Sequence, residues 1–213
     1  ATTDVDKAVI VGDNAAIADM TSDADGTVAI GQKALTALTQ GIGNVAVGME
    51  ALKAAVTSDY NTAVGTGALT AVNSDDDGAN VGIGRLAGGL LTSGVNCTYV
   101  GTTAGYTNAT GGNNTYIGRS AGYGTASGNN SNNTAVGHNA LLDITTGTAN
   151  TALGVSAGSE ITDGGNNVLI GNGAGGNAVN MTTGDQCVVI GSLADVSTAD
   201  AQNQIAIGYD CSA

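Results

Sequence analysis

Branched aliphatic residues and glycine recur along the chain at a strict spacing. Val, Ile or Leu directly precedes a glycine in twelve repeats, and we number each repeat from that glycine as position 0. Position −3 is β-branched in all twelve repeats, and position −4 is Asn in seven. Position +3 is Ala in eleven repeats and Cys211 in the last. The repeat glycines are Gly12, Gly31, Gly48, Gly65, Gly84, Gly101, Gly118, Gly137, Gly154, Gly171, Gly191 and Gly208.

A period of two residues places positions −3 and −1 on one face of an extended strand. We expect these stiff β-branched side chains to point into the core, and the variable position −2 to face the other way. A glycine at position 0 indicates a positive φ or a close backbone approach. The segments between repeats are rich in turn-forming residues. The pattern therefore predicts an all-β fold, a parallel β-solenoid or β-roll of about twelve coils of 17–20 residues.

Composition limits what can fill the core of such a solenoid. The chain has 35 Gly, no Pro, no Trp and no Phe, so only six Tyr provide aromatic rings. A conventional globular core with aromatic anchors is excluded. In a thin solenoid, the free energy gained by burying apolar surface is small compared with the conformational entropy lost on folding. Association along its length would bury more, so we expect a homotrimer. We expect residues 1–8 to be an N-terminal extension and residues 9–213 to form one repeat domain.

Two repeats carry a resemblance to known families most closely. They are Asn61-Thr62-Ala63-Val64-Gly65-Thr66-Gly67-Ala68-Leu69 and Asn133-Thr134-Ala135-Val136-Gly137-His138-Asn139-Ala140-Leu141. This unit resembles the head repeats of trimeric autotransporter adhesins, and still more the repeats of phage tail fibres and related virion proteins. The resemblance implies a left-handed parallel β-roll that trimerises about a long axis. In phage fibres a self-cleaving chaperone domain often follows such repeats, and none is found in this sequence. Nor does it show a signal peptide, a heptad stalk or membrane-anchor strands, so we expect a virion protein rather than an autotransporter.

The spacing between repeat glycines contains a second period. Every third interval is 19 or 20 residues instead of 17, which gives a superperiod of 53 residues through most of the chain. The extra residues fall in 22–26, 73–78, 128–132 and 180–186. In one interpretation each repeat is one coil and the longer loops project at intervals. In the other, three repeats form one 53-residue layer of a single-chain, three-sided prism.

Charge narrows the range of partners. The formal net charge is −13, so the chain cannot release counterions from phosphates and we expect no nucleic-acid partner. No apolar run approaches the length that spans a bilayer, so we expect no membrane insertion.

Asp75, Asp76 and Asp77 form an acidic cluster that could supply oxygen ligands to Ca²⁺. Without a calcium-binding repeat beside it, we interpret the cluster as a solvated loop and expect no metal.

Catalytic chemistry finds little support in the sequence. His138 is the only histidine, at the variable position +1, with no evident partner for acid–base work. Cys97 and Cys187 replace Asn at position −4 and lack zinc-site spacing, so we expect buried free thiols, with a bridge between chains near the C-terminus as the alternative. Gly82 and Gly84, like Gly171 and Gly173, have the spacing of a phosphate-binding loop, but no helix is predicted after them, as such a loop needs. We therefore expect no enzyme and no cofactor.

The tyrosines separate the remaining function classes. Tyr99 and Tyr116 both occupy position −2 of neighbouring repeats and should stack as a ladder, which favours packing between subunits over a sugar site. We expect a structural component of a bacteriophage virion, either a fibre segment or a capsid or tail decoration protein. It would be made in the host cytoplasm and exposed on the particle, with other virion proteins as partners. The alternative is an adhesin that binds a host surface protein or glycan, with Tyr106 and Tyr123 as its test residues.

Overall fold

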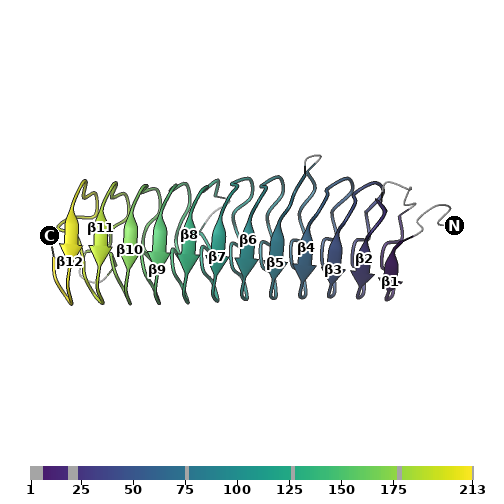
Figure 1. Ribbon diagram of the computed structural model, residues 1–213, viewed down its shortest axis with the longest axis horizontal. Helices are drawn as coiled ribbons and strands as arrows, with labels where there is room; N and C mark the ends of the chain where they lie inside the picture. Colours follow the sequence, from purple (N-terminus) through teal and green to yellow (C-terminus); the bar gives the residue numbers. More distant parts are fainter. Residues whose placement is uncertain (1–6, 19–23, 75–76, 126–127, 177–178, 213) are drawn as a thin grey trace.

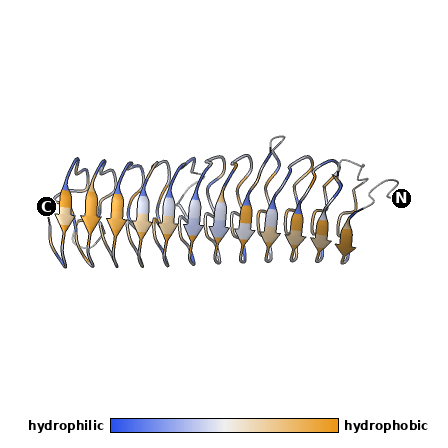
Figure 2. Ribbon diagram, viewed as in Figure 1, coloured by the Kyte–Doolittle hydropathy of each residue, from blue (hydrophilic) through white to orange (hydrophobic). Residues whose placement is uncertain are grey.

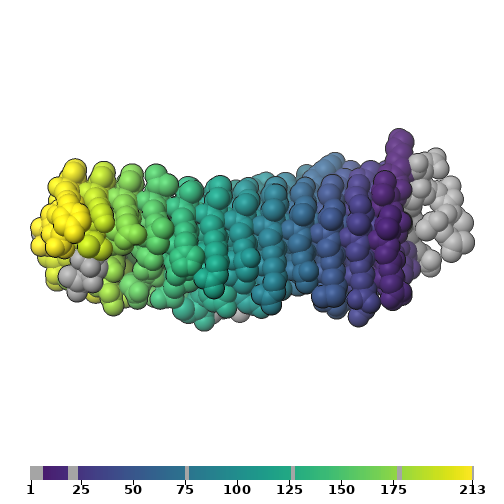
Figure 3. All heavy atoms as spheres, turned by 90° about the horizontal axis from the view of Figure 1, so that it is seen from below, coloured from purple at the N-terminus to yellow at the C-terminus, as the bar shows by residue number. Residues whose placement is uncertain are grey.

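The computed structural model describes residues 7–18, 24–74, 77–125, 128–176 and 179–212. These residues wind into a long rod, with the two ends of the chain at opposite ends of the rod (Figure 1). Consecutive coils form closely packed slices when the rod is seen from below (Figure 3). Each coil contributes one three-residue strand, and no α-helix occurs among the described residues. The all-β solenoid predicted from the repeat is therefore confirmed.

The twelve strands follow the repeat one for one, because each occupies positions −3 to −1. Three residues are a short strand, but its β-branched flanks favour the extended conformation and the repeat glycine ends it. The strands are β1 (Val9–Val11), β2 (Val28–Ile30), β3 (Val45–Val47), β4 (Thr62–Val64), β5 (Val81–Ile83), β6 (Thr98–Val100), β7 (Thr115–Ile117), β8 (Thr134–Val136), β9 (Thr151–Leu153), β10 (Val168–Ile170), β11 (Val188–Ile190) and β12 (Ile205–Ile207).

Strand order decides between the two interpretations of the superperiod. The strands form one parallel sheet in the order β1 to β12, so every strand pairs with the strands of the preceding and following repeats. The register is constant, with position −3 opposite position −3, as in Val45 opposite Thr62. Each repeat is therefore one coil. The three-sided prism with 53-residue layers is wrong, since consecutive repeats stack and do not lie side by side in one layer. Some of the extra residues of the longer intervals, 22–23 and 75–76, lie outside the described ranges.

The prediction of which strand positions face the core was wrong. Position −2 is buried in β2 to β12, whereas positions −3 and −1 are half-buried or exposed throughout the sheet. The β-branched residues thus point away from the coil. The physical reason is the small cross-section of a 17-residue coil, in which positions −4 and −2 share the inner face with the returning half of the same coil.

The core consists mainly of alanines and leucines, and the β-branched residues at positions −3 and −1 of the strands lie outside it. The Ala at position +3 is buried in all eleven coils that have it, as the repeat predicted. Positions +4 and +7 add larger side chains such as Leu35 and Leu38, both without exposed surface. These residues belong to the returning half of the coil and meet position −2 from the opposite side.

A column of glycines explains why position 0 never varies. Gly84 has φ of +130°, and a Cβ atom built on it would lie 2.6 Å from the carbonyl oxygen of Gly101 in the next coil. Real Cβ atoms do not approach a backbone oxygen so closely. Both expected reasons for glycine, the positive φ and the close approach, therefore hold at once.

Candidate functional site: an outward apolar sheet face

The outer face of the sheet is the main candidate site, and we call the residues at positions −3 and −1 of the twelve strands the strand face. Position −1 is aliphatic in every strand and points outward. Ile83 is 40% exposed, Leu153 49% and Ile207 66%. Because neighbouring strands lie about 4.8 Å apart, these side chains form a continuous apolar column along the rod. Nothing among the described residues covers it.

Position −3 makes the strand face less uniform along its length. It is Val or Ile in the three strands at each end, whereas Thr occupies it in β4 and in β6 to β9. Colouring by hydropathy shows this, because strands near both ends are orange and those in the middle, apart from β5, are paler (Figure 2). The face therefore combines an unbroken aliphatic column with a second column that is apolar at the ends and rich in hydroxyls in the middle.

A ladder of buried asparagines connects neighbouring coils directly before the strands. The Asn residues at position −4 have no exposed surface, and each accepts a hydrogen bond on its side-chain oxygen from the backbone N–H of the next coil. The amide of Asn133 also donates to the carbonyl oxygen of Gly147, at 2.9 Å. Buried polar groups require such partners, so the ladder fixes the position from which each strand starts. The repeat pattern shows this Asn, but its role was not predicted. Its two-residue separation from position −2 was the signal that could have revealed the inner face.

Cys97 and Cys187 take the place of Asn in this ladder, and the expectation of buried free thiols is confirmed for both. Both are buried free thiols, and Cys211 is a free thiol that is partly exposed. The thiol of Cys97 lies 3.4 Å from the carbonyl oxygen of Gly111, where an asparagine amide would otherwise donate. Burial raises the pKa of the Cys97 thiol, which disfavours the reactive thiolate. These two thiols are structural.

Tyr99 and Tyr116 stack as expected but lie in the wrong place for the expected role. Their ring centroids are 5.5 Å apart, and the ring planes make an angle of 19°. Both rings have no exposed surface, so they belong to the chain's own core and cannot pack against another subunit. Their hydroxyl groups bond with Asn108 and Asn130 inside the coil. Burial raises the pKa of both phenols. The proposed contact ladder between subunits is therefore wrong.

A second aromatic pair does reach the surface. Tyr106 and Tyr123 stack with ring centroids 5.5 Å apart and an angle of 16°, and both are half-buried. They occupy position +5, on the returning half of the coil opposite the strand face. The Tyr106 ring lies over Gly89, where a Cβ atom would come within 2.9 Å of it. Asp143 at position +6 lies one coil beyond Tyr123, and burial raises the pKa of its carboxyl group.

The remaining polar candidates do not assemble into a reactive site. His138 is exposed and lies 3.0 Å from a guanidinium nitrogen of Arg119, the same position of the preceding coil. Asp75 and Asp76 lie outside the described residues, and Asp77 is exposed and pairs through its backbone with Asp59. Within the described part of the chain, no three His, Cys, Asp or Glu side chains gather closely enough to hold a metal ion.

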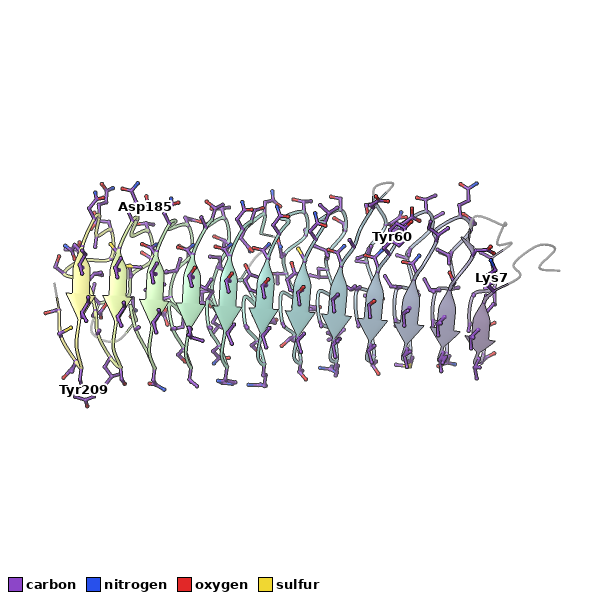
Figure 4. All side chains as sticks on the ribbon, viewed as in Figure 1. Lys7, Tyr60, Asp185 and Tyr209 are labelled. Atoms are coloured by element: carbon purple, nitrogen blue, oxygen red, sulfur yellow. The ribbon has the colours of Figure 1, made fainter. Side chains whose placement is uncertain are left out.

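Charged residues are distributed unevenly between the two edges of the sheet, a feature that the repeat pattern did not predict. Each strand runs from one turn edge, which we call the leading edge, to the trailing edge that carries positions 0 to +2. Tyr60 and Asp185 mark the leading edge and Tyr209 the trailing edge (Figure 4). The described residues of the leading edge include Asp59 and Asp185. The trailing edge carries both signs at positions +1 and +2, with Asp13, Lys33, Glu50, Arg85, Arg119 and Asp210.

The site is thus a long apolar face bordered by two charged edges, suited to binding an extended surface rather than a small molecule. No helix in the described ranges is long and apolar enough to cross a bilayer. No protein-family model, curated protein or solved structure matches this chain, so this geometry and the repeat pattern carry the functional argument.

Proposed function

We propose that this protein is a non-catalytic structural rod that associates with copies of itself through the strand face. The observation that carries the proposal is the unbroken outward column of Val, Ile and Leu at position −1. Monomeric soluble proteins rarely expose continuous apolar surface of this extent. A β-branched residue in every strand is also unnecessary for the monomer, whose core uses other positions.

The size of the strand face fits a stable interface. Two outward residues on each of twelve strands give a surface comparable with the roughly 20–30 residues that each partner contributes to a standard interface. Backbone hydrogen bonds already satisfy the strands laterally, so the face offers mainly apolar side chains. Burying such side chains on association is favourable at roughly 25 cal/mol per Å² before association costs are subtracted.

We further propose a homotrimer that forms part of a bacteriophage virion, as a fibre segment or a capsid or tail decoration protein. The repeat's similarity to phage tail-fibre and adhesin-head repeats supports both the trimer and the virion location. In this proposal the rod is made in the host cytoplasm, is exposed on the particle and contacts other virion proteins. It needs no cofactor and catalyses no reaction.

A host-surface adhesin is the second candidate, favoured by one observation. The Tyr106–Tyr123 pair lies half-exposed on the side of the coil away from the strand face, so it would stay accessible in a trimer. Aromatic rings beside a carboxylate such as Asp143 are a common surface for sugars. Loss of glycan-array binding in the double variant Tyr106→Ala, Tyr123→Ala would support this function, and an array with no binding by the unaltered protein would oppose it.

Native mass spectrometry of the purified protein tests self-association directly. We expect a species with three times the chain mass of 20.5 kDa. A dimer would keep the associating face but overturn the trimer. A monomer at every concentration up to about 100 μM, well above the micromolar range of weak assemblies, would overturn the proposal.

A further inference from the structure

The middle of the rod carries no acidic residue. The chain has 18 Asp and Glu among its 213 residues, yet none of them occurs from residue 78 to residue 142. This stretch contains both arginines of the chain and its only histidine. It includes strands β5 to β8, which are consecutive in the sheet and lie in the middle of the rod (Figure 1). An acidic protein thus has a cationic middle section.

The basic side chains of this section lie in one column of the trailing edge. Arg85, Arg119 and His138 all occupy position +1 and are exposed, and Thr102 occupies the same position in the coil between the two arginines. We call these four residues the cationic column. Tyr209 marks the same edge in Figure 4, and Figure 3 shows the rod from that side. Because coils stack at about 4.8 Å, the column is about 14 Å long.

The two arginines have most of their donors available. Within the described ranges, ion pairs are formed by Lys33 and Lys53 with Glu50, and neither arginine takes part in one. The guanidinium of Arg119 instead donates to Nε2 of His138, at 3.0 Å. A guanidinium has five N–H donors and no acceptor, so this contact uses a single donor and assigns the imidazole proton to Nδ1. The column therefore presents a row of outward donors without an acidic partner.

From this row of donors we infer that the cationic column binds an acidic polysaccharide, whose sulfate or carboxylate groups contact Arg85 and Arg119. Arginine can bind such planar or tetrahedral oxyanions with two parallel hydrogen bonds. The donors lie in a row along an exposed edge and do not converge on one point, so they fit an extended ligand better than a single small anion. The hydroxyl of Thr102 lies between the arginines and can bond with the neutral part of the polymer. This site is separate from the Tyr106–Tyr123 pair, and its binding does not depend on self-association.

A nucleic acid fits the same column less well. Its affinity for proteins comes from many phosphate contacts, whereas the column offers two permanent positive charges. The acidic remainder of the rod, which gives the chain its net charge of −13, would repel a polymer that carries a charge on every nucleotide. A polysaccharide with more widely spaced acidic groups can place them on the arginines and its neutral hydroxyl groups elsewhere.

Three polymers with one sugar backbone test the inference, namely dextran, carboxymethyl-dextran and dextran sulfate. Biolayer interferometry of the whole protein on each immobilised polymer should show binding to a charged polymer, none to dextran, and weaker binding as salt is raised above about 0.1 M. Comparing the two charged polymers distinguishes sulfate from carboxylate. We expect the double variant Arg85→Gln, Arg119→Gln to raise the dissociation constant about tenfold or more. The double variant Lys33→Gln, Lys53→Gln is the matched control. It removes the same charge from coils that carry Glu50 and should raise the constant less than about threefold.

A gain of binding provides a second test that misfolding cannot imitate. Thr102→Arg adds a third arginine to the column, and we expect it to lower the dissociation constant for the bound polymer about threefold or more. Thr183→Arg adds the same charge at an exposed position before β11 and should have a smaller effect.

Three results would overturn the inference. They are no binding to either charged polymer, equal losses in the arginine and lysine double variants, and equal gains in Thr102→Arg and Thr183→Arg. Tighter binding of a single-stranded oligonucleotide than of both charged polymers would overturn the polysaccharide as the ligand. None of these results bears on self-association, which native mass spectrometry tests separately.

Discussion

Positions −2 and +4 of one coil share a single interior space, and their side-chain sizes compensate. Where position −2 is Ala, as at Ala63 and Ala135, position +4 can be Leu, as at Leu69 and Leu141. Where position −2 is Tyr99, position +4 is Gly105, and a Cβ atom there would lie 2.5 Å from the tyrosine ring. Protein interiors are packed too densely to hold two large side chains in that space. The stacked Tyr99 and Tyr116 in the middle of the rod therefore depend on a glycine at position +4 of the same coil.

A double-mutant cycle tests this compensation. We expect Gly105→Leu to destabilise the fold by about 3 kcal/mol through overpacking, and Tyr99→Ala by about 3–5 kcal/mol through a cavity. The double variant should lose at least about 2 kcal/mol less than the sum, because it recreates the Ala–Leu pairing of other coils. Leucine tolerates the backbone there, since Leu69 and Leu141 have φ of 48° and 50° and Gly105 has 60°.

Urea unfolding of the four proteins at one fixed protein concentration gives the coupling free energy. The fixed concentration matters because association contributes to the apparent stability. Additive effects within about 0.5 kcal/mol would contradict the shared space.

At the scale of the element, each coil depends almost entirely on its two neighbours. A three-residue strand pairs only with the strands above and below, and the Asn ladder links the same two coils. The energetics of such a fold are close to those of a one-dimensional stack. A whole coil should therefore be removable if its neighbours can form the contacts that it made.

Deletion of residues 138–154 is designed to preserve those contacts. It joins Gly137 to Val155, so Ala135 gains Gly158 as its position +4 partner, a pairing that Ala152 has in the native chain. The side chain of Asn133 then lies one coil from Asn167 and can accept its backbone N–H, as Asn150 does now. We expect a folded, shorter rod with a β-type circular dichroism spectrum and a melting temperature within about 5 °C of the original. Deleting only residues 138–145 is the control, and it should lower the melting temperature much more because it breaks the register. Equal losses in both variants would argue against independent coils.

The sequence predicted the coils and strands well, because both follow from the spacing of glycine and β-branched residues. The twelve glycines, the Ala at position +3 and the stacking of Tyr99 on Tyr116 all match their expected roles in the fold. The direction of the faces was not predicted, because β-branched residues usually indicate burial and here they face outward. Both faces of each strand carry mostly apolar residues, Ala or larger side chains inside and mainly β-branched ones outside, so periodicity alone cannot tell the two faces apart. The buried Asn at position −4 resolves the ambiguity only once its hydrogen bonds are known.

At the scale of the whole molecule, two opposing effects act on the rod. A net charge of −13 per chain makes copies repel one another, whereas the strand face favours their association. None of the twelve strands contains an acidic residue, so the repulsion is weakest across the strand face. An assembly that buries this face would remain soluble through its charged outer surface.

One substitution on each side of the rod separates an interface role from general stability. Ile117 in the strand face and Leu90 on the returning half of the coil are both 39% exposed, so replacing either by Lys removes a similar apolar side chain. We expect Ile117→Lys to dissociate the assembly, because three symmetry-related charges would meet near the axis of a trimer with little water to solvate them. Leu90→Lys should leave the assembly intact. Size-exclusion chromatography with light scattering measures both masses, and circular dichroism shows whether each variant keeps its fold. If Ile117→Lys assembles as well as Leu90→Lys does, the strand face is not where the copies meet.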